Sequence, residues 1–201
     1  MAGKVLALLL ATAILLTPRG GAALDNGVGQ RPQLGFNSWN AWGCAVNETV
    51  LRSTMDAFVT LGLRDAGFEY VSTDDCWQSG CRIGQPGCTL HKRLGRHPNG
   101  TVIPNPDKFP SGMKALADYA HSKRLKFGLY SSNSERTCGG HAGSQGFEQI
   151  DAASYASWGV DLLKYDNCGG EATNGPPEHG YAVMRDALAQ CHWAPHPLFS
   201  L

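Results

Sequence analysis

Short apolar runs alternate with longer amphipathic stretches from residue 24 onward, a pattern typical of βα units around a parallel sheet. The apolar runs predict four strands, at residues 34–37, 70–73, 126–130 and 160–165. Apolar positions at helical spacing predict a helix after each strand, at residues 49–66, 112–123, 147–158 and 180–190. The pattern stops after Gln190, so we expect no fifth strand.

The connection over residues 74–110 is too long for a simple link between a strand and a helix. Loops of this length in compact domains are usually functional or disordered. No G-x-G-x-x-G follows the first predicted strand, which argues against a dinucleotide site. Four βα units leave two α/β architectures open, part of a (β/α)8 barrel or a small open sheet. A full barrel takes about 250 residues, more than the 201 of this chain.

Residues 1–23 have the layout of a secretory signal peptide, with Lys4, an apolar run over 5–16 and small residues before Leu24. The apolar run is shorter than the roughly 20 residues of a membrane-spanning helix. We therefore expect a mature chain that begins at Leu24, without a membrane anchor. Its expected destination is the extracellular space, a lysosome or a vacuole.

The charges are balanced, with 17 Lys and Arg against 17 Asp and Glu, and like charges form no run. Binding to a phosphate backbone depends on clustered basic residues. We therefore expect no nucleic-acid partner.

All seven cysteines follow the predicted signal peptide, and an exported chain passes through an oxidising compartment, so disulfides are expected. There is no C-x-x-C pair, and we expect neither a metal nor a cofactor. An odd number of cysteines leaves one thiol free or paired outside the chain. Two N-x-T sequons, at Asn47 and Asn99, are candidates for N-glycosylation.

Every predicted strand ends in polar and aromatic residues, at the edge where a parallel barrel carries its catalytic groups. These ends are Asn37-Ser38-Trp39, Asp74-Asp75-Cys76-Trp77, Tyr130-Ser131-Ser132 and Lys164-Tyr165-Asp166-Asn167-Cys168. The adjacent carboxylates of Asp74 and Asp75 repel each other unless a ligand or a cation uses them. Trp77 beside them can stack on a hexose ring. Turn or capping aspartates are the alternative interpretation.

Lys164 and Asp166 are two residues apart on a strand, so their side chains leave the same face. An ammonium beside a carboxylate stabilises the ionised form, which a nucleophile needs. A structural ion pair fits the spacing equally well. Trp39 and Tyr130 are either core aromatics or part of a sugar site.

Several segments, in order along the chain, resemble glycoside hydrolase family 27, the α-galactosidases and α-N-acetylgalactosaminidases. They include Leu34-Gly35-Phe36-Asn37-Ser38-Trp39, Asp74-Asp75-Cys76-Trp77, Thr137-Cys138-Gly139-Gly140 and Lys164-Tyr165-Asp166-Asn167-Cys168. The resemblance implies a (β/α)8 TIM-barrel glycosidase that releases terminal α-linked galactose with retention, as a monomer or a homodimer. Residues 24–190 would form the N-terminal half of the barrel, about four βα units, and residues 191–201 a divergent, truncated tail.

By this resemblance Asp166 is the nucleophile. The galactose ring is held by Trp39, Asp74, Asp75, Tyr130, Cys138 and Lys164. The family's bridges map onto Cys44–Cys76 and Cys138–Cys168, Cys81 and Cys88 are close enough for a third, and Cys191 is left free.

The family's acid/base aspartate comes from a later strand, past Leu201, so we expect the chain by itself to be inactive unless Glu171 substitutes. Two alternatives stay open. One is a non-catalytic galactose-binding or vestigial protein, and the other is an α-N-acetylgalactosaminidase.

Overall fold

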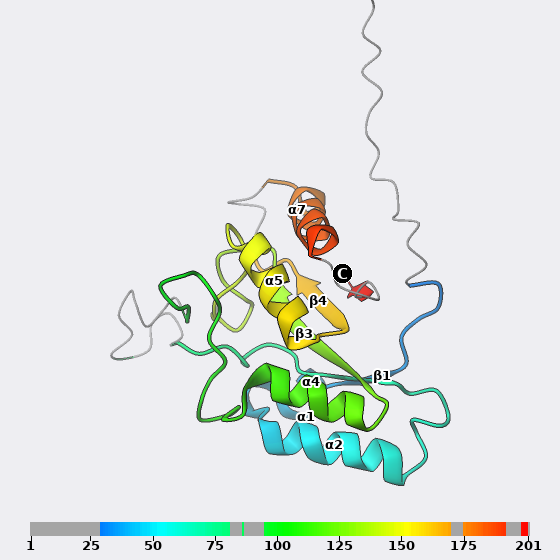
Figure 1. Ribbon diagram of the computed structural model, residues 1–201. Helices are drawn as coiled ribbons and strands as arrows, with labels where there is room; N and C mark the ends of the chain where they lie inside the picture. Colours follow the sequence, from blue (N-terminus) through cyan, green and yellow to red (C-terminus); the bar gives the residue numbers. More distant parts are fainter. Residues whose placement is uncertain (1–28, 81–85, 87–94, 170–174, 192–197, 201) are drawn as a thin grey trace, which may run out of the picture.

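A parallel five-stranded sheet is the centre of the computed structural model, which describes residues 29–80, 86, 95–169, 175–191 and 198–200 (Figure 1). Each strand pairs with the next one along the chain, in the order β1-β2-β3-β4-β5. The strands are β1 (Gly35–Asn37), β2 (Tyr70–Ser72), β3 (Lys126–Ser132), β4 (Leu162–Asp166) and β5 (Leu198–Ser200). The four predicted strands are thus confirmed. The predicted signal peptide lies outside the described residues.

Helices follow the strands and contact one another in chain order, α2 with α4, α4 with α5, and α5 with α7 (Figure 1). They are α1 (Trp39–Trp42), the 3-10 turn η1 (Gly43–Ala45), α2 (Glu48–Thr60), α4 (Gly112–Ser122), α5 (Glu148–Trp158) and α7 (Pro177–Gln190). α2 begins where the Asn47 side chain accepts a hydrogen bond from Val50 N, 3.0 Å. It ends six residues before the predicted limit, because turns with Gly62 and Gly67 at positive φ follow.

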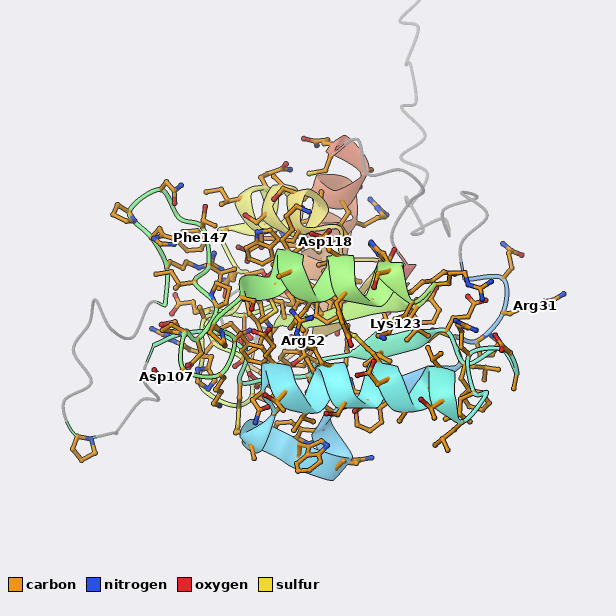
Figure 2. The ribbon with its side chains drawn as sticks, turned by 60° about the horizontal axis from the view of Figure 1, so that its bottom comes forward. Arg31, Arg52, Asp107, Asp118, Lys123 and Phe147 are labelled. Carbon is orange, nitrogen blue, oxygen red and sulfur yellow. A yellow bond between two sulfur atoms is a disulfide. The ribbon has the colours of Figure 1, made fainter. Side chains whose placement is uncertain are left out.

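Charged side chains of α2 and α4 meet between the two helices, where Figure 2 labels Arg52 and Lys123. Both cations lie over the Tyr119 ring, with Arg52 Cζ 4.4 Å and Lys123 Nζ 4.7 Å from its centroid. The Tyr119 hydroxyl donates to Asp56 of α2, 2.8 Å. These contacts fix α4 beside α2. None of the helices in the described ranges is long and apolar enough to cross a bilayer.

The expectation that no fifth strand follows Gln190 is wrong, because the structure has β5 at Leu198–Ser200. β5 pairs with β4 in parallel, in a register that runs from Leu162 opposite Leu198 to Lys164 opposite Ser200. Three residues are too short a run for hydrophobic periodicity to show. The strand forms because the edge of β4 offers unpaired backbone N–H and C=O groups.

The two faces of the sheet differ in polarity. Buried apolar side chains on one face join the helices in a single core, among them Val71, Phe127, Leu129, Leu163 and Tyr165. The other face lines a hollow of about 320 Å³ with Gly35, Asn37, Ser72 and Lys164 among its walls. The register sets Ser72 beside Gly128 and Tyr130 beside Lys164 on this face. Small and polar residues thus stand on this face beside Phe36, Tyr70 and Leu162, which also line the hollow.

Candidate functional site

Three neighbouring strands bring four of the predicted site residues together at their C-terminal ends. In the register of β3 and β4, Tyr130 lies beside Lys164 and Ser132 beside Asp166. The Tyr130 hydroxyl donates to Asp166 Oδ2 over 3.0 Å. Lys164 Nζ lies 5.2 Å from the centroid of the Tyr130 ring and 2.6 Å from Asp74 Oδ2. The four side chains therefore form one chain of contacts, from Asp166 through Tyr130 and Lys164 to Asp74.

Asp166 is the last residue of β4, and its half-buried side chain can be reached by a ligand. One carboxylate oxygen accepts the hydrogen bond of Tyr130, and the other accepts from the backbone N–H of Asn167, 2.8 Å. Burial raises the pKa of the Tyr130 phenol well above its usual range, and the negative charges of Asp75 and Asp166 raise it further. Tyr130 therefore keeps its proton and acts as a donor to the carboxylate.

The partner of Lys164 differs from the expected one. Its ammonium forms an ion pair with Asp74, whose side chain is 3% exposed, rather than with Asp166. A carboxylate this far from water requires a counter-charge or hydrogen bonds. Since β4 brings Lys164 across from the end of β2, the lysine meets this need and fixes the Asp74 side chain.

Asp75 is fixed by the backbone. Its carboxylate accepts hydrogen bonds from the N–H groups of Cys76, 2.6 Å, and Gly139, 2.5 Å, and the residue is 1% exposed. Asp74 likewise accepts from Asp75 N, 2.8 Å. Both aspartates thus make the local bonds expected of turn residues, in addition to lying in the cluster. Cys76 has a φ of 72°, which is unusual for a residue with a side chain and is found preferentially at functional sites.

Two disulfides enclose this region. Cys44–Cys76 has a Cα separation of 5.1 Å and Cys138–Cys168 one of 5.0 Å, and these are the two pairings that the resemblance implied. The sulfur of Cys138 lies 3.7 Å from Asp166 Oδ2. Cys191 is free, as expected. Cys81 and Cys88 lie outside the described residues.

Cysteine groups with metal-ligand spacing occur twice in the described part of the chain. One combines Cys44 and Cys76 with His141, and the other combines Cys138 and Cys168 with Asp166. In each group the two cysteines are joined in a disulfide, whereas metal ligation by cysteine requires thiolates. With the bridges intact, neither group offers a set of metal ligands.

The two tryptophans near the site have opposite environments. Trp39 begins α1 directly after β1 and is 42% exposed, so its ring is open to a ligand. Trp77, interpreted above as able to stack on a sugar, is fully buried and packs edge to face against Tyr155 and Trp158. Its Nε1–H donates to the backbone oxygen of Tyr130, 2.8 Å. Trp77 therefore supports the site from the core. A tryptophan after an Asp-Asp pair can stack on a sugar or pack in the core, and the sequence alone does not distinguish the two.

Three residues of the quoted segments hold the site in place, although the sequence predicted no role for them individually. The Ser38 hydroxyl accepts from Asp74 N, 2.9 Å, and the N–H of Gly139 binds Asp75. The Ser132 hydroxyl lies 3.2 Å from both Asp166 O and Cys168 N. Serines and glycines of this kind are too common in loops for a single sequence to single them out.

Peptide mapping under non-reducing conditions will recover Cys138 and Cys168 in one disulfide-linked pair of peptides from protein made in an oxidising compartment. Their backbones already lie at a separation that suits a bridge. Alkylation before digestion separates paired cysteines from free ones, and Cys191 provides the alkylated control. Full alkylation of Cys138 and Cys168 would contradict the prediction.

Comparison with known proteins places the chain among glycosidases. Residues 35–194 match a family described as alpha galactosidase A. The chain is 43% identical over 198 residues to alpha-galactosidase A of Cellvibrio japonicus, covering 98% of this chain and 44% of that protein. It is 47% identical over 165 residues to alpha-galactosidase 3 of Arabidopsis thaliana, covering 82% and 34%.

Solved structures agree with these sequence relatives. Alpha-galactosidase I from Mortierella vinacea superposes with a TM-score of 0.75 at 38% identity, over 88% of this chain and 42% of that one. Alpha-galactosidase from Saccharomyces cerevisiae superposes with a TM-score of 0.74 at 39% identity, over 87% and 36%. The chain thus spans less than half the length of each of these proteins.

Proposed function

Because the chain belongs to the alpha galactosidase A family of glycoside hydrolases, we propose that it supplies the nucleophile of a retaining α-galactosidase. Its sheet, with strands in chain order and a helix after each of the first four, is part of the family's (β/α)8 barrel. The proposed substrate is a terminal, non-reducing α-D-galactosyl residue of an oligosaccharide, glycolipid or polysaccharide.

The observation that carries this proposal is the setting of Asp166 at the end of β4. Its carboxylate is oriented by Tyr130 and by Asn167 N and remains half-exposed. In the proposed reaction, one oxygen of Asp166 attacks the anomeric carbon while the leaving oxygen is protonated. The resulting covalent galactosyl ester is then hydrolysed by water, so the configuration is retained.

In the proposed complex, galactose binds to hydrogen-bond acceptors and donors that the buried polar groups do not use within the fold. Each carboxylate oxygen has two lone pairs, so Asp74 and Asp75 can still accept sugar hydroxyls beside the hydrogen bonds that fix them. The exposed Trp39 ring offers a face for the apolar side of the pyranose. Lys164 donates to Asp74 and can donate to a sugar oxygen as well, because it has three N–H groups.

A retaining mechanism needs a second carboxyl group about 5–5.5 Å from the first. Asp74 forms an ion pair with the Lys164 ammonium, and Asp75 accepts two backbone hydrogen bonds, so both carboxyl groups are already engaged within the fold. We propose that the acid/base residue comes from outside the described residues. Glu171, which the sequence offered for this role, also lies outside them.

Hydrolysis of 4-nitrophenyl α-galactoside tests the proposal, with the full-length protein, by which we mean this chain continued through the rest of the barrel. NMR of the first product should show α-galactose before mutarotation, and the matching N-acetylgalactosaminide should react far more slowly. Relatives at 43–47% identity bear the name alpha-galactosidase, which favours galactose over N-acetylgalactosamine. Formation of β-galactose first would reject retention, and absence of turnover would reject the function.

A second candidate function is galactose binding without turnover by residues 24–201 on their own. It is favoured because the proposed sugar-binding groups surround Asp166, while Asp74 and Asp75 are engaged by Lys164 and by the N–H of Gly139. Calorimetric titration with galactose, beside the chromogenic assay, separates the two functions. Turnover above that of an Asp166→Asn control would exclude the second candidate for this part of the protein.

Tyr130→Phe in the full-length protein should lower kcat/KM by about 10- to 100-fold, because a hydrogen bond to a charged group contributes about 1.5–3 kcal/mol. The ring stays, and only the donor to Asp166 is lost. Since burial and nearby charges raise the pKa of Tyr130, its deprotonation does not shape the pH profile. The alkaline limb of kcat/KM should therefore be the same in both proteins. A limb that moves in the variant would show that Tyr130 titrates.

We also propose that the protein is exported. The layout of residues 1–23 supports this, as do the two disulfides, which persist in oxidising compartments.

A further inference from the structure

The two N-x-T sequons occupy very different positions in the fold. Asn99 lies at the exposed tip of a hairpin, and Asn47 lies at the partly buried start of α2. We propose that the exported protein carries an N-linked oligosaccharide on Asn99 and none on Asn47. The inference depends on the proposed export, but not on the proposed catalytic activity.

Backbone hydrogen bonds define the hairpin that carries Asn99. Ile103 N donates to Gly95 O, 2.8 Å, and His97 N donates to Thr101 O, 2.8 Å. Gly100 N closes the tip by donating to His97 O, 2.9 Å, with Gly100 at a φ of 89°. The turn is thus local in sequence, since all of these bonds join residues 95–103.

The Asn99 side chain is oriented for modification. Its Oδ1 accepts a hydrogen bond from Thr101 N over 3.1 Å, which joins the two defining residues of the sequon in one Asx turn. The amide nitrogen, which is the atom that receives the sugar, has no hydrogen bond to any described residue. The residue as a whole is exposed, at the tip of the hairpin.

The base of the hairpin is rigid, so a glycan at the tip leaves the fold unchanged. Arg96 donates to Gly100 O, 2.7 Å, Gly143 O, 2.8 Å, and both carboxylate oxygens of Asp151. The guanidinium also lies 4.1 Å from the centroid of the Phe147 ring. None of these contacts uses the Asn99 side chain.

Asn47, by contrast, uses its whole side chain in the fold. Its Oδ1 caps α2 through Val50 N, 3.0 Å, and its Nδ2 donates to Ala45 O, 3.5 Å. The flanking residues are buried, Val46 at 0% and Glu48 at 8% exposure, and Glu48 accepts from Ser111 N, 2.9 Å. A sugar on Nδ2 would have to occupy space beside these buried residues, so we expect Asn47 of the exported protein to be unmodified.

The modification uses a lipid diphosphate oligosaccharide as donor. A bond forms between Asn99 Nδ2 and the anomeric carbon of the first sugar, the bond from that carbon to the diphosphate breaks, and one amide proton leaves. No oxidant or reductant takes part, and one N–H remains on the amide, as does the Oδ1 acceptor of the Asx turn.

The test is expression of the full-length protein in a eukaryotic secretory host, followed by enzymatic release of N-glycans and peptide mass spectrometry. Release converts a glycosylated asparagine into aspartate, so the peptide containing residue 99 should show this conversion and the peptide containing residue 47 should not. Asn99→Gln and Thr101→Ala should each remove one glycan. Thr101→Ser, which keeps the sequon, and Asn47→Gln should leave the glycan count unchanged.

A parallel preparation with an established leader peptide in place of residues 1–23 separates export from modification. If Asn99 carries a glycan in the leader fusion but not in the native protein, residues 1–23 are not a working signal peptide. The assignment of Asn99 as the acceptor would still be supported. Unmodified Asn99 in the exported leader fusion would overturn the proposal, as would a glycan on Asn47 of the exported protein. Asn99→Gln should retain full glycosidase activity, because the hairpin tip takes no part in the sugar site.

Discussion

Asp166→Asn in the full-length protein will reduce kcat for α-galactosides by at least about four orders of magnitude, the scale seen when one member of a catalytic set is removed. The amide keeps the volume of the carboxylate, and its oxygen can still accept the hydrogen bond from Tyr130. It is a poor nucleophile, however, so no galactosyl ester forms. The site would therefore remain assembled while the first chemical step is lost.

Two measurements distinguish this outcome from misfolding. Galactose affinity, measured by calorimetry, should stay within about tenfold of the parent value, a change below about 1.4 kcal/mol. Asp118→Asn on the exposed surface of α4, labelled in Figure 2, is the matched control and should keep full activity. Substantial turnover by the Asp166 variant would place the nucleophile elsewhere, with Asp75 the next residue to test.

Asp151→Asn will lower the free energy of unfolding by about 3–5 kcal/mol, because it leaves a buried guanidinium without its counter-charge. The Arg96 and Asp151 side chains are 5% and 0% exposed, and their atoms meet at 2.6 and 2.7 Å. Burial disfavours the charge on Arg96, but the hydrogen bond and the charge of Asp151 outweigh it and raise the pKa of the guanidinium. A loss of this size is a large part of the 5–15 kcal/mol that usually holds a domain folded.

Urea unfolding of the full-length protein measures this loss. Asp118→Asn again provides the control, since its ion pair with Lys114 has side-chain exposures of 58% and 62% and pairs of that kind contribute about 0–1 kcal/mol. A change below about 1 kcal/mol for Asp151→Asn would show that Arg96 is held by its carbonyl acceptors, Gly100 and Gly143. In either case the contacts of Arg96 tie the Asn99 hairpin to Asp151 of α5. Gly143, which also accepts from Arg96, lies close in sequence to Gly139, whose N–H binds Asp75.

The sequence by itself determined the local elements and the chemistry at their ends. Runs of apolar residues long enough to show a period predicted β3, β4, α4 and α5 to within two residues, because each pattern reflects burial of one continuous segment. Polar residues after those strands then pointed to Asp166 and Tyr130, since parallel strands present their C-terminal ends at one edge. The pairing of cysteines came from the resemblance, not from spacing.

Only the tertiary structure decided which distant groups meet. Lys164 lies two residues from Asp166 but pairs with Asp74, 90 positions away, and Arg96 meets Asp151 across 55 positions. Trp77 belongs to the core, and β5 forms on the open edge of β4 from only three residues. Local periodicity reports whether a segment has a buried face. Local periodicity does not report the register between strands or the path of the loops. Register and loop path set the distances between side chains from different segments.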